Sequence, residues 1–117
     1  KWRKVCRLPG NTGFGPLGGT DTEERITMTV DEYETIRLID LKRFTQEECA
    51  GQMNVARTTV QGIYDNARKK LADSLVNGKV LLIGGGEYIL CDGLEEVCGC
   101  GGCHRHRCGR RFEEDVE

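Results

Sequence analysis

The chain has 117 residues, enough for one domain with a modest hydrophobic core and a small appended segment. Its formal net charge is only −2, so composition alone does not indicate a nucleic-acid-binding protein. The total conceals blocks of opposite sign: residues 1–10, 57–79 and 98–111 are basic, whereas 21–48, 80–97 and 112–117 are acidic. Because a polyanion responds to the local field, one basic docking surface is compatible with this pattern.

The cysteine content and the hydropathy pattern indicate the cellular compartment in which we expect the protein. The longest purely aliphatic run, residues 80–83, is far too short to cross a bilayer, and no secretory signal is recognisable. Seven cysteines without a secretory context suggest a reducing compartment. We therefore expect a cytoplasmic protein with no membrane partner, whose cysteines are core residues or metal ligands.

Residues 1–28 form the first predicted unit, a basic strand followed by a glycine-rich loop. The stretch 2–8 alternates basic with apolar residues, which fits either an arm that touches phosphates or an edge strand with a solvated face. The loop 9–19 lacks the Lys and Ser/Thr of a phosphate-binding P-loop, so we expect a flexible loop held by Phe14. Residues 25–28 are a second candidate strand.

Residues 29–78 form the second predicted unit, three helices. Thr29 with Glu32, and Thr45 with Glu48, have the spacing of capping boxes and predict helices over 30–41 and from 46. The first is acidic in its first turn, which would repel phosphate, so we interpret it as a supporting helix. Its predicted apolar contacts are Val30, Tyr33, Ile36, Leu38, Ile39 and Leu41.

The stretch 45–71 has the pattern of a helix-turn-helix. Asn54 tolerates the left-handed conformation that a tight turn needs, and a further helix is predicted from about Ala56 to Val76, before Asn77 and Gly78. Its predicted core face consists of Val60, Ile63, Ala67 and Leu71. Amide, hydroxyl and guanidinium groups then point outward, which is typical of a helix that reads DNA.

This stretch resembles the helix-turn-helix of sigma-70 region 4. The positions in step with that pattern are Thr45, Glu47, Glu48, Val55, Arg57, Val60, Ile63, Ala67, Lys70 and Leu71. The segments VDEYETIRLIDL and ADSLVNGKVL on either side resemble a family of small, largely uncharacterised prokaryotic proteins that is predicted to bind DNA. The resemblance covers most of the chain and implies a mainly α fold with small β elements (α+β), built on three helices.

The resemblance also implies which residues touch DNA. The start of the last helix would enter the major groove, with Arg57, Thr58 and Gln61 at base edges. Phosphate contacts would come from Thr59, Arg68 and Lys69, with Lys1, Arg3 and Lys4 as additions. One bidentate contact discriminates by about 1–3 kcal/mol, so Arg57 alone cannot define an operator and we expect a homodimer on two half-sites.

Four positions depart from the sigma pattern. Ala56 stands where a serine is common, which removes a helix cap worth about 1 kcal/mol. Thr59 and Gln61 are neutral where arginines are usual, and Asn54 replaces the turn glycine. The core spacing survives these changes, so they affect which bases are read rather than the fold.

Residues 79–92 form the third predicted unit. The segment KVLLIGGGEYIL has two apolar runs around three glycines and predicts a β-hairpin. A hairpin here could be a wing that touches DNA, but Glu87 and the shortage of basic residues disfavour that. Pairing with the N-terminal strands or with a second subunit is the favoured interpretation.

Residues 93–117 form a Cys/His-rich tail, the fourth unit. Its candidate metal ligands are Cys98, Cys100, Cys103, Cys108, His104 and His106. Four thiolates suffice for a tetrahedral zinc site, an iron–sulfur cluster is the alternative, and copper(I) also suits these donors. A reduced tail that binds metal only incidentally is the remaining interpretation. Cys49, Cys6 and Cys91 are expected to fill the core, although Cys6 and Cys91 could add ligands.

Together these patterns predict a sequence-specific protein that binds double-stranded DNA and regulates transcription, with a metal held for structure or sensing. The alternative is a metal-binding interaction module that uses the helix pair to dock protein. An enzyme is not expected, since no nucleophile–base–orienter set or catalytic carboxylate pair can be recognised.

Overall fold

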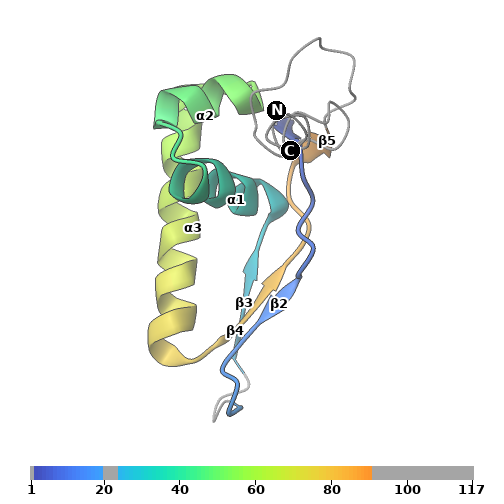
Figure 1. Cartoon of the computed structure of the whole chain (residues 1–117), viewed down its shortest axis with the longest axis vertical. Helices are drawn as coiled ribbons and strands as arrows, with labels where there is room; N and C mark the ends of the chain where they lie inside the picture. The colour runs from blue at the N-terminus through green and yellow to red at the C-terminus, as the bar shows by residue number, and fades with distance from the viewer. Residues whose placement is uncertain (1, 20–23, 91–117) are drawn as a thin grey trace, which may run out of the picture.

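The computed structural model describes residues 2–19 and 24–90. Within them the fold is α+β, as predicted, with a long helix beside short strands (Figure 1). The elements in chain order are β1 (Arg3–Val5), β2 (Gly13–Phe14), β3 (Arg25–Met28), α1 (Val30–Thr35), η1 (Ile36–Leu41), α2 (Gln46–Met53), α3 (Arg57–Asn77), β4 (Val80–Ile83) and β5 (Tyr88–Leu90). No helix in these ranges has the length and apolar character needed to cross a membrane.

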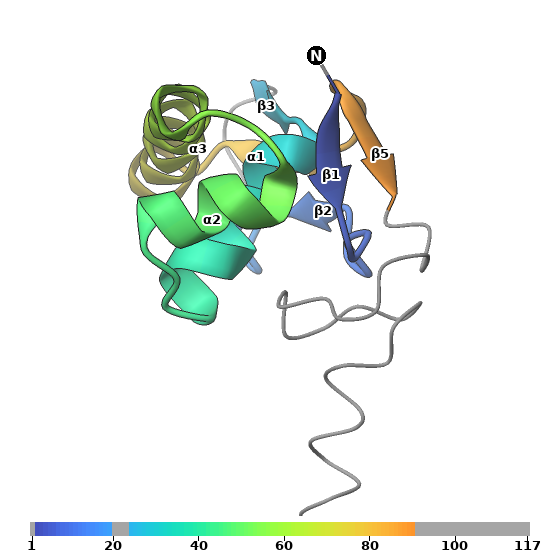
Figure 2. The same ribbon diagram turned by 90° about the horizontal axis from the view of Figure 1, so that it is seen from above.

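The long helix α3 runs along one side of the molecule and the strands along the other (Figure 1). Helix α1 lies between them and packs on α3, while α2 crosses near the start of α3, as the view from above shows (Figure 2). Two apolar clusters result from this arrangement. One joins Cys6 to η1, α2 and the start of α3; the other joins Met28, Ala67, Leu81 and Ile83.

The strands form two small sheets rather than the predicted hairpin. Strand β4 pairs in parallel with β3 and antiparallel with β2, whereas β5 pairs in parallel with β1. The registers place Leu81 beside Ile26 and Leu90 beside Val5. The hairpin prediction for 79–92 was therefore wrong, and the expected pairing of this segment with the N-terminal strands is confirmed.

The three glycines explain why the chain does not turn back on itself. Gly85 and Gly86 have positive φ angles of 75° and 100°, and the loop closes over the start of α1. The Gly84 amide donates to Met28 O at 2.9 Å, and Gly85 O accepts from the Val30 amide at 2.9 Å. The loop thus satisfies one helix-terminal amide of α1 and carries the chain from one sheet to the other.

The predicted helix starts are confirmed in detail. Thr29 Oγ1 accepts from the Glu32 amide at 3.4 Å while Glu32 Oε1 accepts from the Thr29 amide at 2.9 Å. Thr45 and Glu48 make the same reciprocal pair at 3.0 and 2.9 Å. Each box satisfies two amides that the helix itself leaves unpaired, and for this reason such spacing is readable in sequence.

The helix predicted over 30–41 is present, but its second half, η1, is π-helical, and its buried face differs from the prediction. Leu41, expected in the core, is 71% exposed, while Asp31, Glu32, Glu34, Thr35 and Arg37 are buried. A π-helical stretch shifts the positions that face the core. Strand β1 also covers the side of α1 that a periodicity argument assigns to solvent.

An ion pair, Glu34 with Arg37, is buried under β1. Glu34 is fully buried, and its two carboxylate oxygens accept from Arg37 Nε at 2.7 Å and Arg37 Nη2 at 3.0 Å. The Cys6 amide donates to Glu34 Oε2 at 3.1 Å. The bidentate geometry and the backbone donor compensate the desolvation of the carboxylate.

Glu34→Gln tests this pair. The amide cannot neutralise the Arg37 guanidinium, so the free energy of unfolding should fall by about 3–5 kcal/mol in urea titrations. Glu47→Gln, on the exposed first turn of α2, is the control and should change it by less than about 0.5 kcal/mol. Equal effects of the two substitutions would contradict the structural role given to Glu34.

Gly86→Ala tests the loop. A Cβ at Gly86 would lie 2.7 Å from Thr29 Cβ and 2.6 Å from Asp31 Oδ1, in a left-handed conformation that alanine disfavours. We expect a loss of at least about 1–2 kcal/mol in thermal or urea unfolding. Gly84→Ala is the matched control, because a Cβ there meets nothing within 4 Å, and it should be neutral or slightly stabilising.

Candidate nucleic-acid interface

The turn between α2 and α3 sets the angle of the helix pair. Asn54 ends α2 in the left-handed conformation, with φ 60° and ψ 44°, as the sequence predicted. The Val55 amide then donates to Ala50 O at 3.1 Å, which closes the end of α2. Beneath the turn, Cys49 and Met53 of α2 and Val60 of α3 are fully buried in one cluster. The two helices are therefore held by contacts at both the turn and the core.

Helix α3 presents opposite faces to the core and to solvent. Val60, Ile63 and Ala67 are buried, as predicted from their spacing. Arg57, Thr58 and Gln61, the predicted base-edge residues, are all exposed in the first turns, while Thr59 is half-buried. Positions i and i+4 share a helix face, so Arg57 lies beside Gln61. The structure thus brings the three predicted base-edge residues together at one accessible helix end.

The start of α3 lacks a side-chain cap. Its N-cap residue Ala56 makes no side-chain hydrogen bond, and its carbonyl accepts from the amides of Thr59 and Val60 at 3.0 and 3.1 Å. An uncapped N-terminus with exposed first residues leaves the positive end of the helix dipole open to an external anion. The alanine at position 56 therefore leaves this helix end without the side-chain cap that a serine could provide.

The two predicted phosphate residues farther along α3 differ in their surroundings. Lys69 is exposed. Arg68 Nη1 donates to the Tyr64 hydroxyl and to Asp40 Oδ1 at 3.4 Å, and the Tyr64 hydroxyl donates to the same carboxylate oxygen at 2.8 Å. The hydrogen bond to Tyr64 is the main cause that raises the pKa of Arg68, and the negative charge of Asp40 is the next. Arg68 ties α3 to η1, so part of its charge is already balanced by Asp40.

Several exposed charges near the helix pair were missed by the sequence interpretation. Asp65 is exposed, and it is four residues after Gln61 on the same helix face. Its carboxylate would repel phosphate and would limit how far along α3 a DNA backbone can approach. Lys42 and Arg43, in the turn that leads into α2, are exposed as well, and Arg43 adopts a positive φ of 65°.

The N-terminal segment is a strand and not a free basic arm. Arg3 lies beside Glu87, to which its Nη1 donates, and its Nε is 3.9 Å from Asp31 Oδ2. Lys4 is buried. Of the two alternatives left open for residues 2–8, the structure therefore shows the strand, with Arg3 half-buried and Lys4 buried. Lys1 lies outside the described residues.

The two cysteines described by the structure fill the core, as expected. Burial, followed by the charge of Glu34, raises the pKa of the Cys49 thiol to about 12, so it stays protonated at neutral pH. Cys6 Sγ accepts from Gln52 Nε2 at 3.3 Å. Cys91 and the candidate metal ligands, Cys98, Cys100, Cys103, His104, His106 and Cys108, lie outside the described ranges. Within those ranges no group of Cys, His, Asp or Glu is arranged to hold a metal.

Comparison with known proteins places the chain among relatives of unestablished function. A family model described as "Protein of unknown function DUF134" matches residues 1–91. A UPF0251 protein of Desulfitobacterium hafniense (strain Y51) is 68% identical over 108 residues, covering 92% of this chain and 86% of the relative. A UPF0251 protein of Caldanaerobacter subterraneus subsp. tengcongensis is 46% identical over 116 residues, covering 98% and 96%. No solved structure shows a significant match.

These matches extend through the helix pair and the strands on either side of it. Nothing in the relatives' names states an activity, a ligand or a partner. The chain belongs to the DUF134/UPF0251 family of uncharacterised prokaryotic proteins.

Proposed function

We propose that the protein binds double-stranded DNA in a sequence-specific manner, as a homodimeric transcriptional regulator, with the start of α3 in the major groove. The observation that carries this proposal is the joint exposure of Arg57, Thr58 and Gln61 at the start of a helix whose other face is buried. The tight left-handed turn and the core contact with α2 support it, because a reading helix must be held rigidly against its partner helix.

The chemistry of these side chains suits base recognition. A guanidinium can donate twice to guanine, a glutamine amide can pair with adenine, and a threonine methyl can pack on thymine. Asp65 restricts the contact to the first turns of α3, since farther along the helix a carboxylate would face the DNA backbone. The open helix N-terminus at Ala56 supplies a place for one phosphate within those first turns.

The double substitution Arg57→Ala with Gln61→Ala tests the proposal. Loss of two bidentate contacts should weaken binding to a site selected from random duplex DNA by roughly 30-fold or more. Both side chains are exposed, so the melting temperature should not change. Binding is measured by fluorescence anisotropy at fixed salt, since phosphate contacts make affinities salt-dependent.

Arg25→Ala is the matched control for this experiment, because it removes one exposed arginine from β3. It should leave the affinity for the selected site unchanged. If the native chain selects no DNA sequence, or if the double variant binds the selected site as tightly as the native chain, α3 is not the reading element. Docking of protein by the helix pair would then be the function to examine.

We also propose that the cysteine-rich segment binds a metal through Cys98, Cys100, Cys103 and Cys108, with His104 and His106 as further donors. The support is chemical, since thiolates and imidazoles at this density are the ligands of zinc and, for the thiolates, of iron–sulfur clusters. The Cys49 thiol is kept protonated by burial, so it does not compete as a thiolate ligand.

Metal analysis of protein purified without oxygen tests this second proposal. The native chain and Cys49→Ala should retain about one zinc ion, or an equivalent cluster, per chain, while the variant with serine at the four tail cysteines should retain none. Iron with sulfide and visible absorption would assign a cluster instead of zinc. Absence of bound metal in the native protein would refute the proposal, and equal DNA affinity with and without chelator would exclude sensing.

A further inference from the structure

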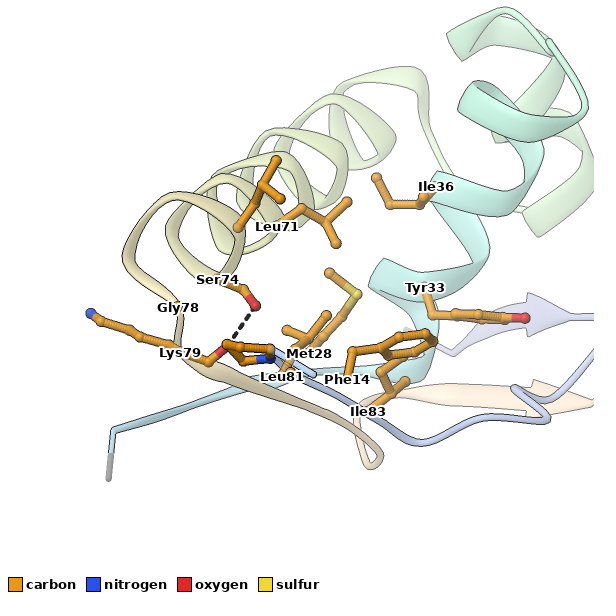
Figure 3. Close-up of a pocket in the computed structure, with 13 residues that line it drawn as sticks. Phe14, Met28, Tyr33, Ile36, Leu71, Ser74, Gly78, Lys79, Leu81 and Ile83 are labelled. Atoms are coloured by element: carbon orange, nitrogen blue, oxygen red, sulfur yellow. Dashed lines mark hydrogen bonds between the residues drawn. The ribbon is translucent and has the colours of Figure 1, made fainter. Parts of the chain in front are cut away.

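A large apolar groove lies at the end of the molecule away from the start of α3. Its cavity volume is about 690 Å³, and it opens between the last turns of α3, α1 and the strands (Figure 3). Met28, Leu71, Leu81 and Ile83 contribute to its floor, with Phe14 and Leu75 among the lining residues. In Figure 3 the labelled apolar side chains from α1, α3, β2, β3 and β4 converge on the same space.

Apolar side chains beside the groove are left in solvent by a single copy of the domain. Leu75 is 85% exposed although it lines the groove, Val76 next to it is also exposed, and Phe14 is half exposed. A contiguous apolar patch of this kind on a soluble chain marks an interaction surface. Scattered single leucines would need no such explanation, but Phe14 and Leu75 line one concavity.

The same face carries a projecting apolar residue. The turn closed by the Gly19 amide donating to Pro16 O at 3.1 Å presents Leu17, which is 106% exposed. Pro16 lines the groove, and its Cγ would be 3.7 Å from a Cβ built at Gly78, so the turn sits against the end of α3. One surface therefore offers both a protruding side chain and, next to it, a cavity that an apolar side chain fits.

The charged side chain at the groove is paired within one copy. Among the described residues that line it, Lys79 is the one with a charged side chain. Its Nζ lies 3.1 Å from Glu24 Oε2 and 3.1 Å from Asp73 Oδ2. With one ammonium and two carboxylates this edge carries a net charge of −1, so the choice of a second copy as the occupant rests on the projecting Leu17 and the cavity beside it rather than on charge.

From these observations we propose that the groove is a homodimer interface in which Leu17 of each copy inserts into the groove of the other. In such a two-fold symmetric contact, each copy inserts its own Leu17 into the partner groove and receives the partner side chain in its own groove. Four of the exposed apolar side chains of each copy (Phe14, Leu17, Leu75 and Val76) then leave solvent together.

The inference does not depend on DNA binding, but it has a consequence for the proposed function. The groove lies at the C-terminal end of α3, and a 21-residue helix is about 31 Å long. Dimerisation at this groove would join two α3 helices near their C-terminal ends and would leave both reading ends free.

Sedimentation equilibrium of the full chain without DNA, in reductant, tests the interface. The native chain should be a dimer, and Leu17→Ser should raise the dimer dissociation constant roughly 100-fold, because both copies lose a buried leucine. Leu41→Ser, the same substitution at an exposed leucine on η1, is the matched control and should leave the dissociation constant unchanged. Leu17 is fully exposed in one copy, so its loss cannot act by unfolding the monomer.

A photo-cross-linking experiment identifies the contact directly. Benzoylphenylalanine replaces Leu17, and chains with light and heavy isotopes are mixed before irradiation. Cross-links between light and heavy peptides that contain Met28 or Leu75 support the proposal. A monomeric native chain, a dimer that Leu17→Ser leaves intact, or cross-links only within one chain would overturn it. Because neither measurement uses DNA, a failure of the dimer proposal can be distinguished from a failure of the DNA-binding proposal.

Discussion

The buried pair of Glu34 and Arg37 is the constraint around which the rest of the domain is arranged. A carboxylate that is fully removed from water needs a full set of donors, and here they come from η1 and from the backbone of Cys6. The Cys6 side chain in turn meets Gln52 of α2. The N-terminal strand, the supporting helix and the first helix of the pair are thereby connected through a single buried carboxylate.

The connection explains why the helix pair and the sheets form one structural unit. The position of β1 is fixed by a polar contact that tolerates little displacement, and β1 fixes β5 through its parallel ladder. Lys70 of α3 adds a second polar link, 2.7 Å from Glu32 of α1. Displacement of the strands would therefore disturb the supporting helix, and through it the helix that we propose reads DNA.

Local signals in the sequence were sufficient to predict the helices. A capping box involves residues three apart, and a left-handed turn residue acts on its own backbone, so Thr45 and Asn54 could be interpreted without knowledge of the fold. The apolar spacing of Val60, Ile63 and Ala67 likewise depends only on helix geometry. The exposed positions of Arg57 and Gln61 followed from that spacing.

The structural features that were not predicted from the sequence depend on residues that lie far apart in the chain. The hydrogen bond that Glu34 accepts comes from Cys6, directly after β1 and 28 residues earlier, and the pairing of Arg68 requires Asp40, also 28 residues earlier. The hairpin error has the same origin, because the apolar pattern of β4 and β5 fits any neighbouring strand equally well. Only the glycine conformations and the helix start at Val30 decide that the chain passes to another sheet.

The parallel ladder between β1 and β5 has a consequence for biosynthesis. It joins Val5, close to the beginning of this sequence, to Leu90, so the ladder cannot close before both strands have left the ribosomal exit tunnel. The segment from α1 to α3 is made of contacts closer in sequence and can assemble while translation continues. During that interval β1 can already dock on α1 and α2 through its contact with Glu34, so β5 is the last of the described elements to reach its final place.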